Sequence, residues 1–251
     1  MQEVRRLKIT ELVKEKGLVK IEELAKMLGT SEVTIHRDLK YLENEGELRK
    51  LRGGAVAIPS EAEVQFSYRT QSCIEEKKLI GMVAAQLIEE GDVVIMDGST
   101  TCLEVAKRIK TMFNITVFTN NPFIMYELMH SQGIILYFIG GLFSRDLECF
   151  VGAEVEDYIS KLHITKGIFG ASAISPKFGI TGPYPQLVSI QKQIIKVSSQ
   201  VIIVADHTKF GKVAFEKAAD VDLIDFIITD SKVDKNIITE LEEKSKVIIA
   251  R

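Results

Sequence analysis

Seven short apolar runs, separated by amphipathic stretches, are the feature that most constrains how this chain folds. The runs occupy residues 93–97, 115–120, 133–141, 167–172, 201–206, 226–230 and 246–250. Runs of this length that alternate with helical patterns are typical of strands buried on both faces of a parallel sheet. The sequence therefore predicts a mostly parallel, Rossmann-like α/β domain over residues 75–251.

A different pattern precedes these runs and consists of short helices. Residues 4–13 place apolar side chains at helical spacing, and residues 21–29 form a second helical pattern that ends in glycine. Ser31 is a good N-cap for a third helix, which is expected to stop at Gly46. Two short helices joined by a three-residue turn indicate a helix–turn–helix.

The segment after the third helix has the pattern of a hairpin. Strand-like runs within residues 47–58 flank an Arg-Gly-Gly turn at residues 52–54, and glycines permit a tight connection there. The chain from residue 1 to 58 is therefore predicted to be a winged helix–turn–helix domain. Residues 59–74, with a proline and a polar stretch, are predicted to be a linker.

One face of the third helix is expected to read double-stranded DNA. Ile35, Leu39 and Leu42 form an inward apolar stripe, which leaves Arg37 and Lys40 facing outward. An arginine there could bind guanine or phosphate, and the basic hairpin could contact the backbone. The alternative is a small packing module with solvated charges. The predicted DNA contacts are Ser31, Thr34, His36, Arg37, Lys40, Arg49, Lys50 and Arg52.

The distribution of charge is compatible with this interpretation, although the net charge of −3 alone argues against a nucleic-acid partner. Residues 1–58 hold 12 Lys and Arg against 10 Asp and Glu, whereas the remainder holds 20 against 25. The excess of positive charge is small, so it matters only if the basic residues share one face.

The segment after the first apolar run predicts an anion site. The run ends at Asp97, which is itself a predicted ligand contact, and Gly98 and Ser99 precede a helix expected to begin near Thr100. Exposed backbone N–H groups, the positive helix end and the hydroxyls of Ser99, Thr100 and Thr101 suit a phosphate. The alternative is an ordinary capped turn between a strand and a helix.

Other polar loops follow the remaining runs. In open α/β sheets the ligand lies beyond the carboxyl ends of the strands. The loops containing Asn120, Gly141 and Lys209 are therefore expected to converge near Asp97. Lys209 could supply a cation to a phosphate, or could be a solvated surface lysine. Gly141 could equally mark a tight turn.

Several classes of site and location are not expected. Cys73, Cys102 and Cys149 fit no CxxC pattern and are interpreted as reduced thiols of a cytoplasmic protein. The four histidines, His36, His130, His163 and His207, show no metal-binding spacing, so no metal or cofactor is predicted. No apolar stretch approaches the ~18 residues of a membrane-spanning helix, and no signal-peptide pattern is visible.

The stretch IEELAKMLGTSEVTIHRDLKYLENEGELRKLRGGAV resembles the DNA-binding signature of the DeoR family of bacterial regulators. The resemblance implies that Arg37 and the hairpin tip, with Gly53, contact operator DNA. The order DGSTT, TNN, IGG, FGAS, GITGP, VADHTKFGK and IITD resembles the DeoR-type sensor domain, which is similar to ribose-5-phosphate isomerase. It implies phosphate binding by Gly98, Ser99, Thr100 and Thr101, with Asn120, Gly141 and Lys209 nearby and Lys192 as a further candidate.

The chain departs from the family pattern at His36, where a second arginine is usual, and at Ser172, Ser189 and Gln191 in the sensor domain. An aldose–ketose isomerase needs a base beside the carbonyl, and a neutral serine hydroxyl is a poor one. We therefore expect a non-enzymatic, homo-oligomeric repressor of sugar-metabolism genes, dimeric or tetrameric, controlled by a phosphorylated sugar. The alternatives are an isomerase with a DNA-binding appendage and an adaptor whose α/β domain only oligomerises.

Overall fold

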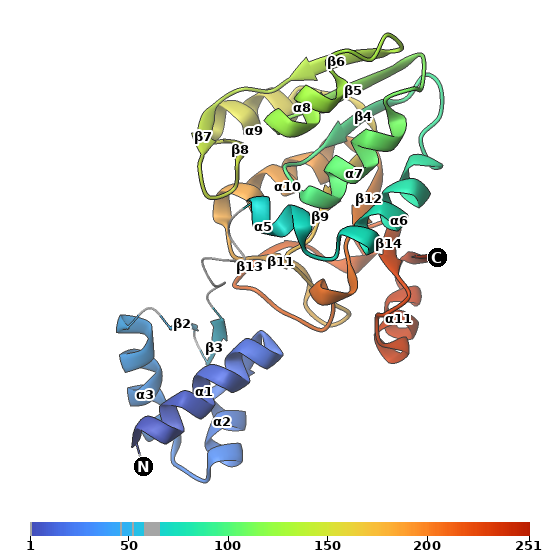
Figure 1. Ribbon diagram of the computed structural model, residues 1–251. Coiled ribbons are helices and arrows are strands. Elements are labelled where there is room, and N and C mark those ends of the chain that lie inside the picture. Colours follow the sequence, from blue (N-terminus) through green and yellow to red (C-terminus); the bar gives the residue numbers. More distant parts are fainter. Residues whose placement is uncertain (1, 46, 52, 58–65) are drawn as a thin grey trace.

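The computed structural model describes residues 2–45, 47–51, 53–57 and 66–251 (Figure 1). Gly46, Arg52 and residues 58–65, which include the first seven residues of the expected linker, lie outside these described residues. A small N-terminal domain lies at one end of a larger α/β domain (Figure 1). A short helix, α5 (Phe66–Gln71), lies within the segment expected to be the linker.

The N-terminal domain has the expected winged helix–turn–helix arrangement. A three-stranded antiparallel sheet with the order β1-β3-β2 packs against three helices. Strand β1 is a third strand that the sequence pattern did not predict. The elements are α1 (Gln2–Lys16), β1 (Leu18–Lys20), α2 (Ile21–Leu28), α3 (Glu32–Asn44), β2 (Leu48–Leu51) and β3 (Gly54–Ala57).

Local capping sets the turn between α2 and α3. Gly29 ends α2 in the left-handed conformation, with φ of 61°, and its N–H donates to the carbonyl of Ala25. Ser31 caps α3, since its hydroxyl accepts the N–H of Thr34 at 3.3 Å. Ile35 and Leu39 are fully buried, which fixes the inward face of α3.

The seven apolar runs form one seven-stranded sheet in which every pairing is parallel. The order across the sheet is β15-β14-β12-β9-β4-β5-β6. The predicted fold class, a mostly parallel α/β domain, is confirmed. The strands are β4 (Val93–Met96), β5 (Ile115–Thr119), β6 (Ile134–Phe138), β9 (Ile164–Gly170), β12 (Ser198–Val204), β14 (Phe226–Asp230) and β15 (Lys246–Ala250).

The strand order reverses between β4 and β9. The chain runs outward from β4 through β5 to β6, and outward on the other side from β9 through β12 and β14 to β15. Loops at such a switch point turn to opposite faces of the sheet, which leaves a crevice beyond the carboxyl ends of the two central strands. The loops after Met96 and Gly170 therefore meet at the place where a ligand is expected.

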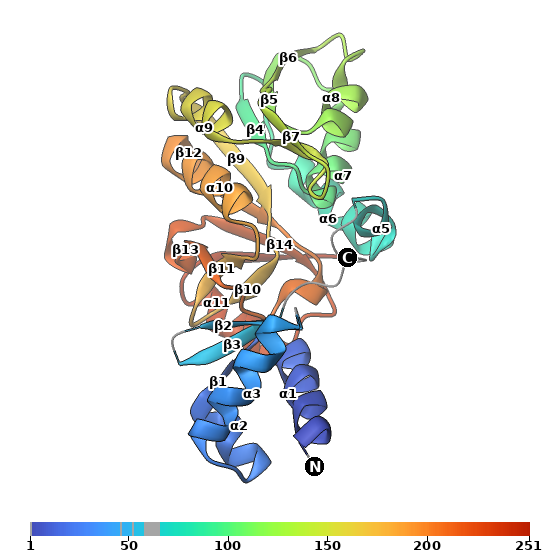
Figure 2. The same cartoon turned by 90° about the vertical axis from the view of Figure 1, so that its left-hand side faces the viewer.

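Helices cover both faces of the sheet, as Figure 2 shows. One face packs on α6 (Ile74–Ala85), α7 (Thr100–Ile109) and α8 (Pro122–Leu128). The other packs on α9 (Ala153–Ser160), α10 (Pro185–Val197) and α11 (Lys235–Glu242). Because both faces are covered, the central strands lie between two apolar cores, which explains their near-continuous hydrophobic sequences.

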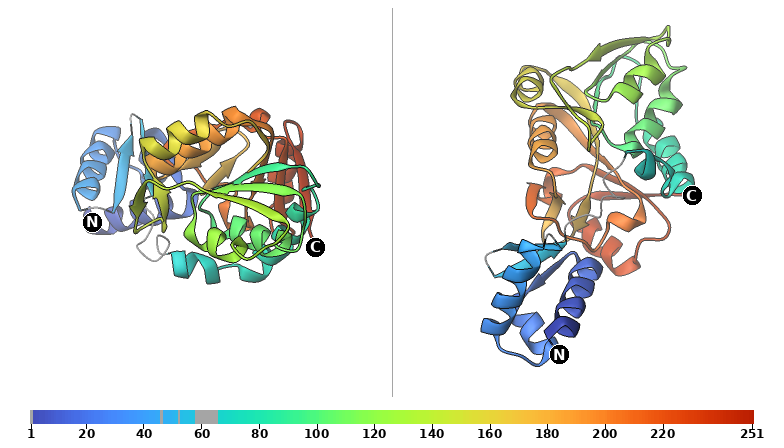
Figure 3. Two further views of the ribbon diagram at one scale, coloured as in Figure 1. Left: turned by 90° about the horizontal axis from the view of Figure 1, so that it is seen from above. Right: turned by 60° about the vertical axis from the view of Figure 1, so that its left-hand side comes forward.

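Smaller elements complete the C-terminal domain. They are the hairpin β7 (Leu142–Ser144) and β8 (Cys149–Val151), the sheet of β10 (Ala173–Ser175), β11 (Gly179–Gly182) and β13 (Glu216–Ala219), and the 3₁₀ turns η1 (His207–Lys209) and η2 (Val221–Leu223). Figure 3 shows the N-terminal domain, in blue, at the end of the molecule that holds the small sheet. Among the described helices, none has the length and apolar character needed to cross a membrane.

Candidate functional site

The outward face of α3 carries the residues predicted to contact DNA. Arg37, His36 and Lys40 are exposed, and the intervening apolar positions point into the domain. The hydroxyls of Ser31 and Thr34 lie 2.9 Å apart at the start of the helix, where Ser31 is the N-cap. A side chain at a helix N-terminus in a major groove is well placed for base edges or phosphate.

Asp38 is a structural residue of this helix that the sequence interpretation missed. It is completely buried, and its carboxylate accepts from Arg5 Nε at 2.6 Å and Arg6 Nε at 3.0 Å. Burial raises its pKa, but the hydrogen bonds from the two guanidinium groups outweigh that effect and hold the pKa below its usual range. The signal was present in the sequence, since Asp38 lies on the same helical stripe as Ile35 and Leu42.

The wing residues divide between two environments. The guanidinium carbon of Arg49 lies 4.1 Å from the ring centroid of Phe215 in the C-terminal domain. The backbone N–H of Lys50 donates to Glu43 Oε1 at 2.9 Å, which ties the wing to α3. Gly53, in the turn between β2 and β3, is exposed and has a φ of 98°. The wing therefore contacts the C-terminal domain as well as α3.

Asp97 organises the switch point between β4 and β9. Its Oδ1 accepts the N–H groups of Ser99 at 3.0 Å and Gly170 at 3.2 Å. Its Oδ2 accepts from Gln191 Nε2 at 3.3 Å, and the same nitrogen donates to the carbonyl of Gly170. Burial raises the pKa of Asp97 despite these bonds. The carboxylate thus holds the two central loops together, and Gln191, a departure from the family pattern, satisfies it.

The start of α7 lies beside this carboxylate. Ser99 is the N-cap, since its hydroxyl accepts the N–H of Cys102 at 3.1 Å. Thr100 and Thr101 follow in the first turn, and the Thr100 hydroxyl donates to the carbonyl of Arg69 at 3.4 Å. The predicted opening of a helix after Asp97 is therefore present, with its positive end at the switch point.

A cavity of about 390 Å³ occupies this position. Five of the predicted ligand contacts line it, namely Asp97, Ser99, Thr100, Thr101 and Lys209. Ser172 and Gln191 also line it, as do Lys212, Val213 and Ala214 of the loop before β13 and Gly17 of the N-terminal domain. The cavity therefore touches both domains.

Two cationic side chains of the cavity were missed by the sequence interpretation. Lys77 is buried, which lowers its pKa to about 8, and its ammonium donates to the carbonyl of Arg69. Arg69 also lines the cavity, and burial lowers its pKa too. Lys77 shares the buried stripe of α6 with Ile80 and Ala84, and a lysine on an apolar stripe is the signal that could have found it.

Four predicted ligand contacts lie elsewhere. Asn120 Nδ2 donates to the carbonyl of Phe150 at 2.6 Å. A Cβ at Gly98 would lie 2.7 Å from the Cβ of Cys149, and one at Gly141 would lie 2.9 Å from the carbonyl oxygen of Val151. These three residues therefore pack against the β7–β8 hairpin.

The fourth of these residues, Lys192, carries an ammonium that lies 3.2 Å from Glu216 Oε1. None of the four is among the residues that line the cavity, so their part in binding stays a prediction.

Comparison with known protein families identifies both domains. Residues 5–61 match the model of the DeoR-like helix-turn-helix domain, and residues 72–231 match that of the DeoR C terminal sensor domain. The chain belongs to the DeoR family. As a member of this family it is a helix–turn–helix transcriptional regulator rather than an enzyme, as the sequence predicted.

Named relatives extend over nearly the whole of this DeoR-family chain. It is 34% identical to the HTH-type transcriptional repressor GlcR of Bacillus subtilis, over 91% of this chain and 88% of that protein. It is also 34% identical to the transcriptional repressor AccR of Agrobacterium fabrum, over 98% of this chain and 96% of that protein.

Similarity to solved structures is much weaker. A D-ribose-5-phosphate isomerase in complex with phospho-erythronic acid has a TM-score of 0.41 and 15% identity, over 55% of this chain and 54% of that one. The full-length sorbitol operon regulator SorC of Klebsiella pneumoniae has a TM-score of 0.36 and 12% identity, over 80% of this chain and 87% of that one. These values are too low to bear on function.

Proposed function

We propose that this chain is a repressor that binds double-stranded operator DNA. Binding of a phosphorylated sugar in the cavity at the switch point would lower or raise its affinity for that DNA. Residues 1–58 would read the DNA and residues 75–251 would hold the sugar phosphate. The observation that carries the proposal is the cavity itself, where the start of α7 faces the buried cation of Lys77 and the half-buried side chain of Lys209.

The chemistry of the cavity wall fits a phosphoryl group. The first turn of α7 offers backbone N–H groups and the hydroxyls of Ser99, Thr100 and Thr101. Lys77 of α6 and Lys209 of η1 add positive charge to the cavity wall, and burial of Lys77 strengthens its attraction for an anion. The carboxylates of Asp97 and Asp206 could accept hydrogen bonds from sugar hydroxyls.

The repressor role is supported by the names of the relatives, two of which are called transcriptional repressors. Control by a sugar phosphate requires that the ligand bind one arrangement of the two domains better than the other. Gly17 and the loop at Lys212–Ala214 line the same cavity, so a bound ligand would touch both domains. A ligand at this place can therefore favour one domain arrangement.

The test combines ligand binding with DNA binding in the full chain. Phosphorylated sugars and the same sugars without phosphate are screened for a rise in melting temperature, since a ligand of the native state stabilises by mass action. Any hit is then added during an anisotropy titration with DNA selected from a random pool. The proposal expects a response to phosphorylated sugars only, lost in Lys209→Ala and retained in the surface variant Lys235→Ala. It fails if no phosphosugar changes either measurement.

We further propose that the repressor is a homo-oligomer. The edge strand β6 and the neighbouring β7 expose large apolar side chains, with Ile135 61% and Leu142 64% exposed. An exposed sheet edge of apolar residues is a site for pairing with another chain. Two copies would also double the number of base pairs contacted. Sedimentation should show a dimer or tetramer that Ile135→Glu weakens, and a monomeric wild type would contradict the assembly.

A further inference from the structure

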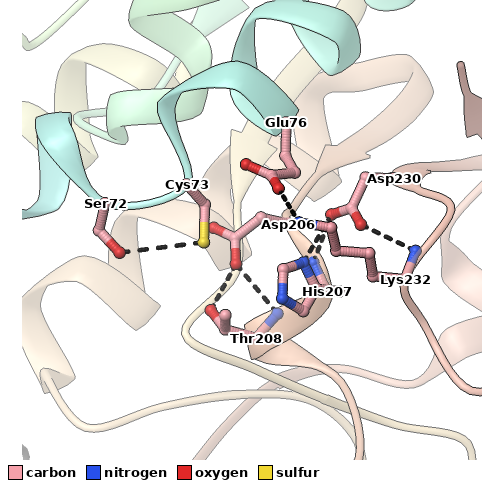
Figure 4. Close-up of polar contacts among 8 residues, drawn as sticks. All are labelled: Ser72, Cys73, Glu76, Asp206, His207, Thr208, Asp230 and Lys232. Carbon is pink, nitrogen blue, oxygen red and sulfur yellow. Dashed lines mark hydrogen bonds and ion pairs between the residues drawn. The ribbon is translucent and has the colours of Figure 1, made fainter.

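A compact group of metal-ligand side chains lies next to the effector cavity. The thiol sulfur of Cys73, a carboxylate oxygen of Asp206 and a ring nitrogen of His207 lie within 4.8 Å of one another (Figure 4). Cys73 precedes α6, whereas Asp206 and His207 follow β12, so the group joins two elements that are distant in sequence. Among the described residues, no other group of three or more His, Cys, Asp or Glu side chains meets this distance.

A second observation concerns the orientation of the imidazole. Asp230 Oδ2 accepts from the backbone N–H of His207 at 2.7 Å and lies 3.1 Å from its ring Nδ1 (Figure 4). Asp230 is buried, so this carboxylate is a fixed acceptor that keeps the proton on Nδ1. The lone pair is then on Nε2. Histidines that bind metals almost always donate their other ring N–H to a carboxylate or a carbonyl in this way.

Asp206 is held in place as well. Its Oδ1 accepts from the backbone N–H of Thr208 at 3.0 Å and from the hydroxyl of the same residue. Asp206 is only 2% exposed, and His207 is half-buried. Two of the three ligand side chains are therefore oriented by neighbours before any ion arrives, which reduces the entropy lost on binding.

We propose that Cys73, Asp206 and His207 form a zinc site, with Sγ, one carboxylate oxygen and Nε2 as ligands. Sulfur, nitrogen and oxygen donors of this kind are those that Zn²⁺ takes in proteins, at about 2.0–2.3 Å. Tetrahedral bonds of that length place the ligand atoms about 3.3–3.8 Å apart, so side-chain movements of about an ångström complete the site. The fourth position is left to water or to another oxygen donor.

The zinc site shares Asp206 with the proposed sugar-phosphate site, but zinc binding does not require that a phosphosugar bind. Asp206 also lines the effector cavity, but neither Cys73 nor His207 does. Zinc would instead tie the start of α6 to the end of β12, which are otherwise joined through side-chain packing. The site can therefore exist whether or not a phosphosugar binds, and the two proposals fail separately when phosphosugar binding is measured with a chelator present.

The experiment is a titration of the reduced, metal-free full chain with Co²⁺ and then Zn²⁺. A thiolate bound to Co²⁺ gives a near-ultraviolet charge-transfer band, and Zn²⁺ should displace the cobalt at one ion per chain. The band should disappear in Cys73→Ser and persist in His130→Ala, an exposed histidine outside the group. Asp230→Asn should weaken zinc binding by about 10- to 100-fold, as expected for the partner of a ligating histidine.

A second measurement covers the case in which a variant fails to fold. Zn²⁺ should raise the melting temperature of the wild-type chain, and a chelator should reverse the rise. Absence of a thiolate band in the folded wild type, or a band that persists in folded Cys73→Ser, would overturn the proposal.

Discussion

The guanidinium of Arg49 lies over the ring of Phe215, with 4.1 Å between the guanidinium carbon and the ring centroid. Arg49 belongs to the wing, and Phe215 directly precedes β13 in the C-terminal domain. The adjacent residues Lys212 to Ala214 line the cavity at the switch point, and the N–H of Ala214 donates to Thr181 Oγ1 at 2.8 Å. One loop therefore touches both the wing and the cavity.

Removal of the Phe215 ring should weaken communication between the two domains. In Phe215→Ala the wing arginine loses a cation–π contact of about 0.5–1 kcal/mol and becomes free to bind phosphate. We expect DNA affinity to rise by about 2- to 5-fold and the effect of a phosphosugar on it to shrink. Anisotropy titrations with and without the ligand measure both. Phe113→Ala removes an exposed phenylalanine that contacts neither the wing nor the cavity, and it should change neither measurement.

Gly17 should not tolerate a side chain, because it combines a left-handed backbone with a close contact. Its φ is 75°, and a Cβ there would lie 2.8 Å from the backbone nitrogen of Val213. Gly29 has a φ of 61° and open space around its Cβ position, so Gly29→Ala shows the cost of the backbone alone, about 1 kcal/mol. Urea unfolding should show a larger loss for Gly17→Ala. Equal losses of stability in the two variants would mean that the contact between Gly17 and Val213 adjusts to the added methyl group at no cost in free energy.

Arg37 should contribute directly to DNA affinity, since it is exposed on the outward face of α3. Arg37→Ala is expected to weaken binding to selected DNA by about 1–3 kcal/mol, because one guanidinium contact to a base or phosphate is lost. Arg108→Ala removes an exposed arginine from α7 and is the matched control for net charge. Unchanged affinity in the Arg37 variant would remove this residue from the DNA interface.

The Asp38 carboxylate should stabilise the N-terminal domain in a pH-dependent way. Its folded-state pKa is lowered by Arg5 and Arg6, so its contribution is complete above the ordinary aspartate pKa of about 4 and is lost as the pH falls through the lowered value. Asp38→Ala should cost about 1.5–3 kcal/mol at pH 7, the contribution expected of hydrogen bonds to charged groups. Urea titrations at pH 7 and below pH 4 should show this difference shrink. A difference independent of pH would contradict the ion pairs.

Much of the fold could be predicted because it depends on neighbours in sequence. Each central strand is buried on both faces, so its residues are apolar one after another and each run is visible without an alignment. Ser31 and Gly29 act within one helical turn of themselves, which is why the turn between α2 and α3 was expected. The same holds for Ser99 at the start of α7.

The candidate site was only partly predictable. The loop after Asp97 was found because a buried strand followed by small polar residues has a local signature. Arg69 and Lys77 were not found, since their place in the cavity depends on how α5 and α6 pack on the sheet. Asn120 also follows a strand, but it does not line the cavity. Its side-chain amide donates to the carbonyl of Phe150 in the β7–β8 hairpin.

The sequence by itself determined the seven strands of the main sheet, their parallel packing and the family, because hydrophobic period, caps and turn residues act over a few positions. Tertiary structure decided which distant residues meet: Asp38 with Arg5 and Arg6, Arg49 with Phe215, and Cys73 with Asp206 and His207. The reason is physical, since strand order and domain packing bring together residues whose separation along the chain carries no signal of their contact.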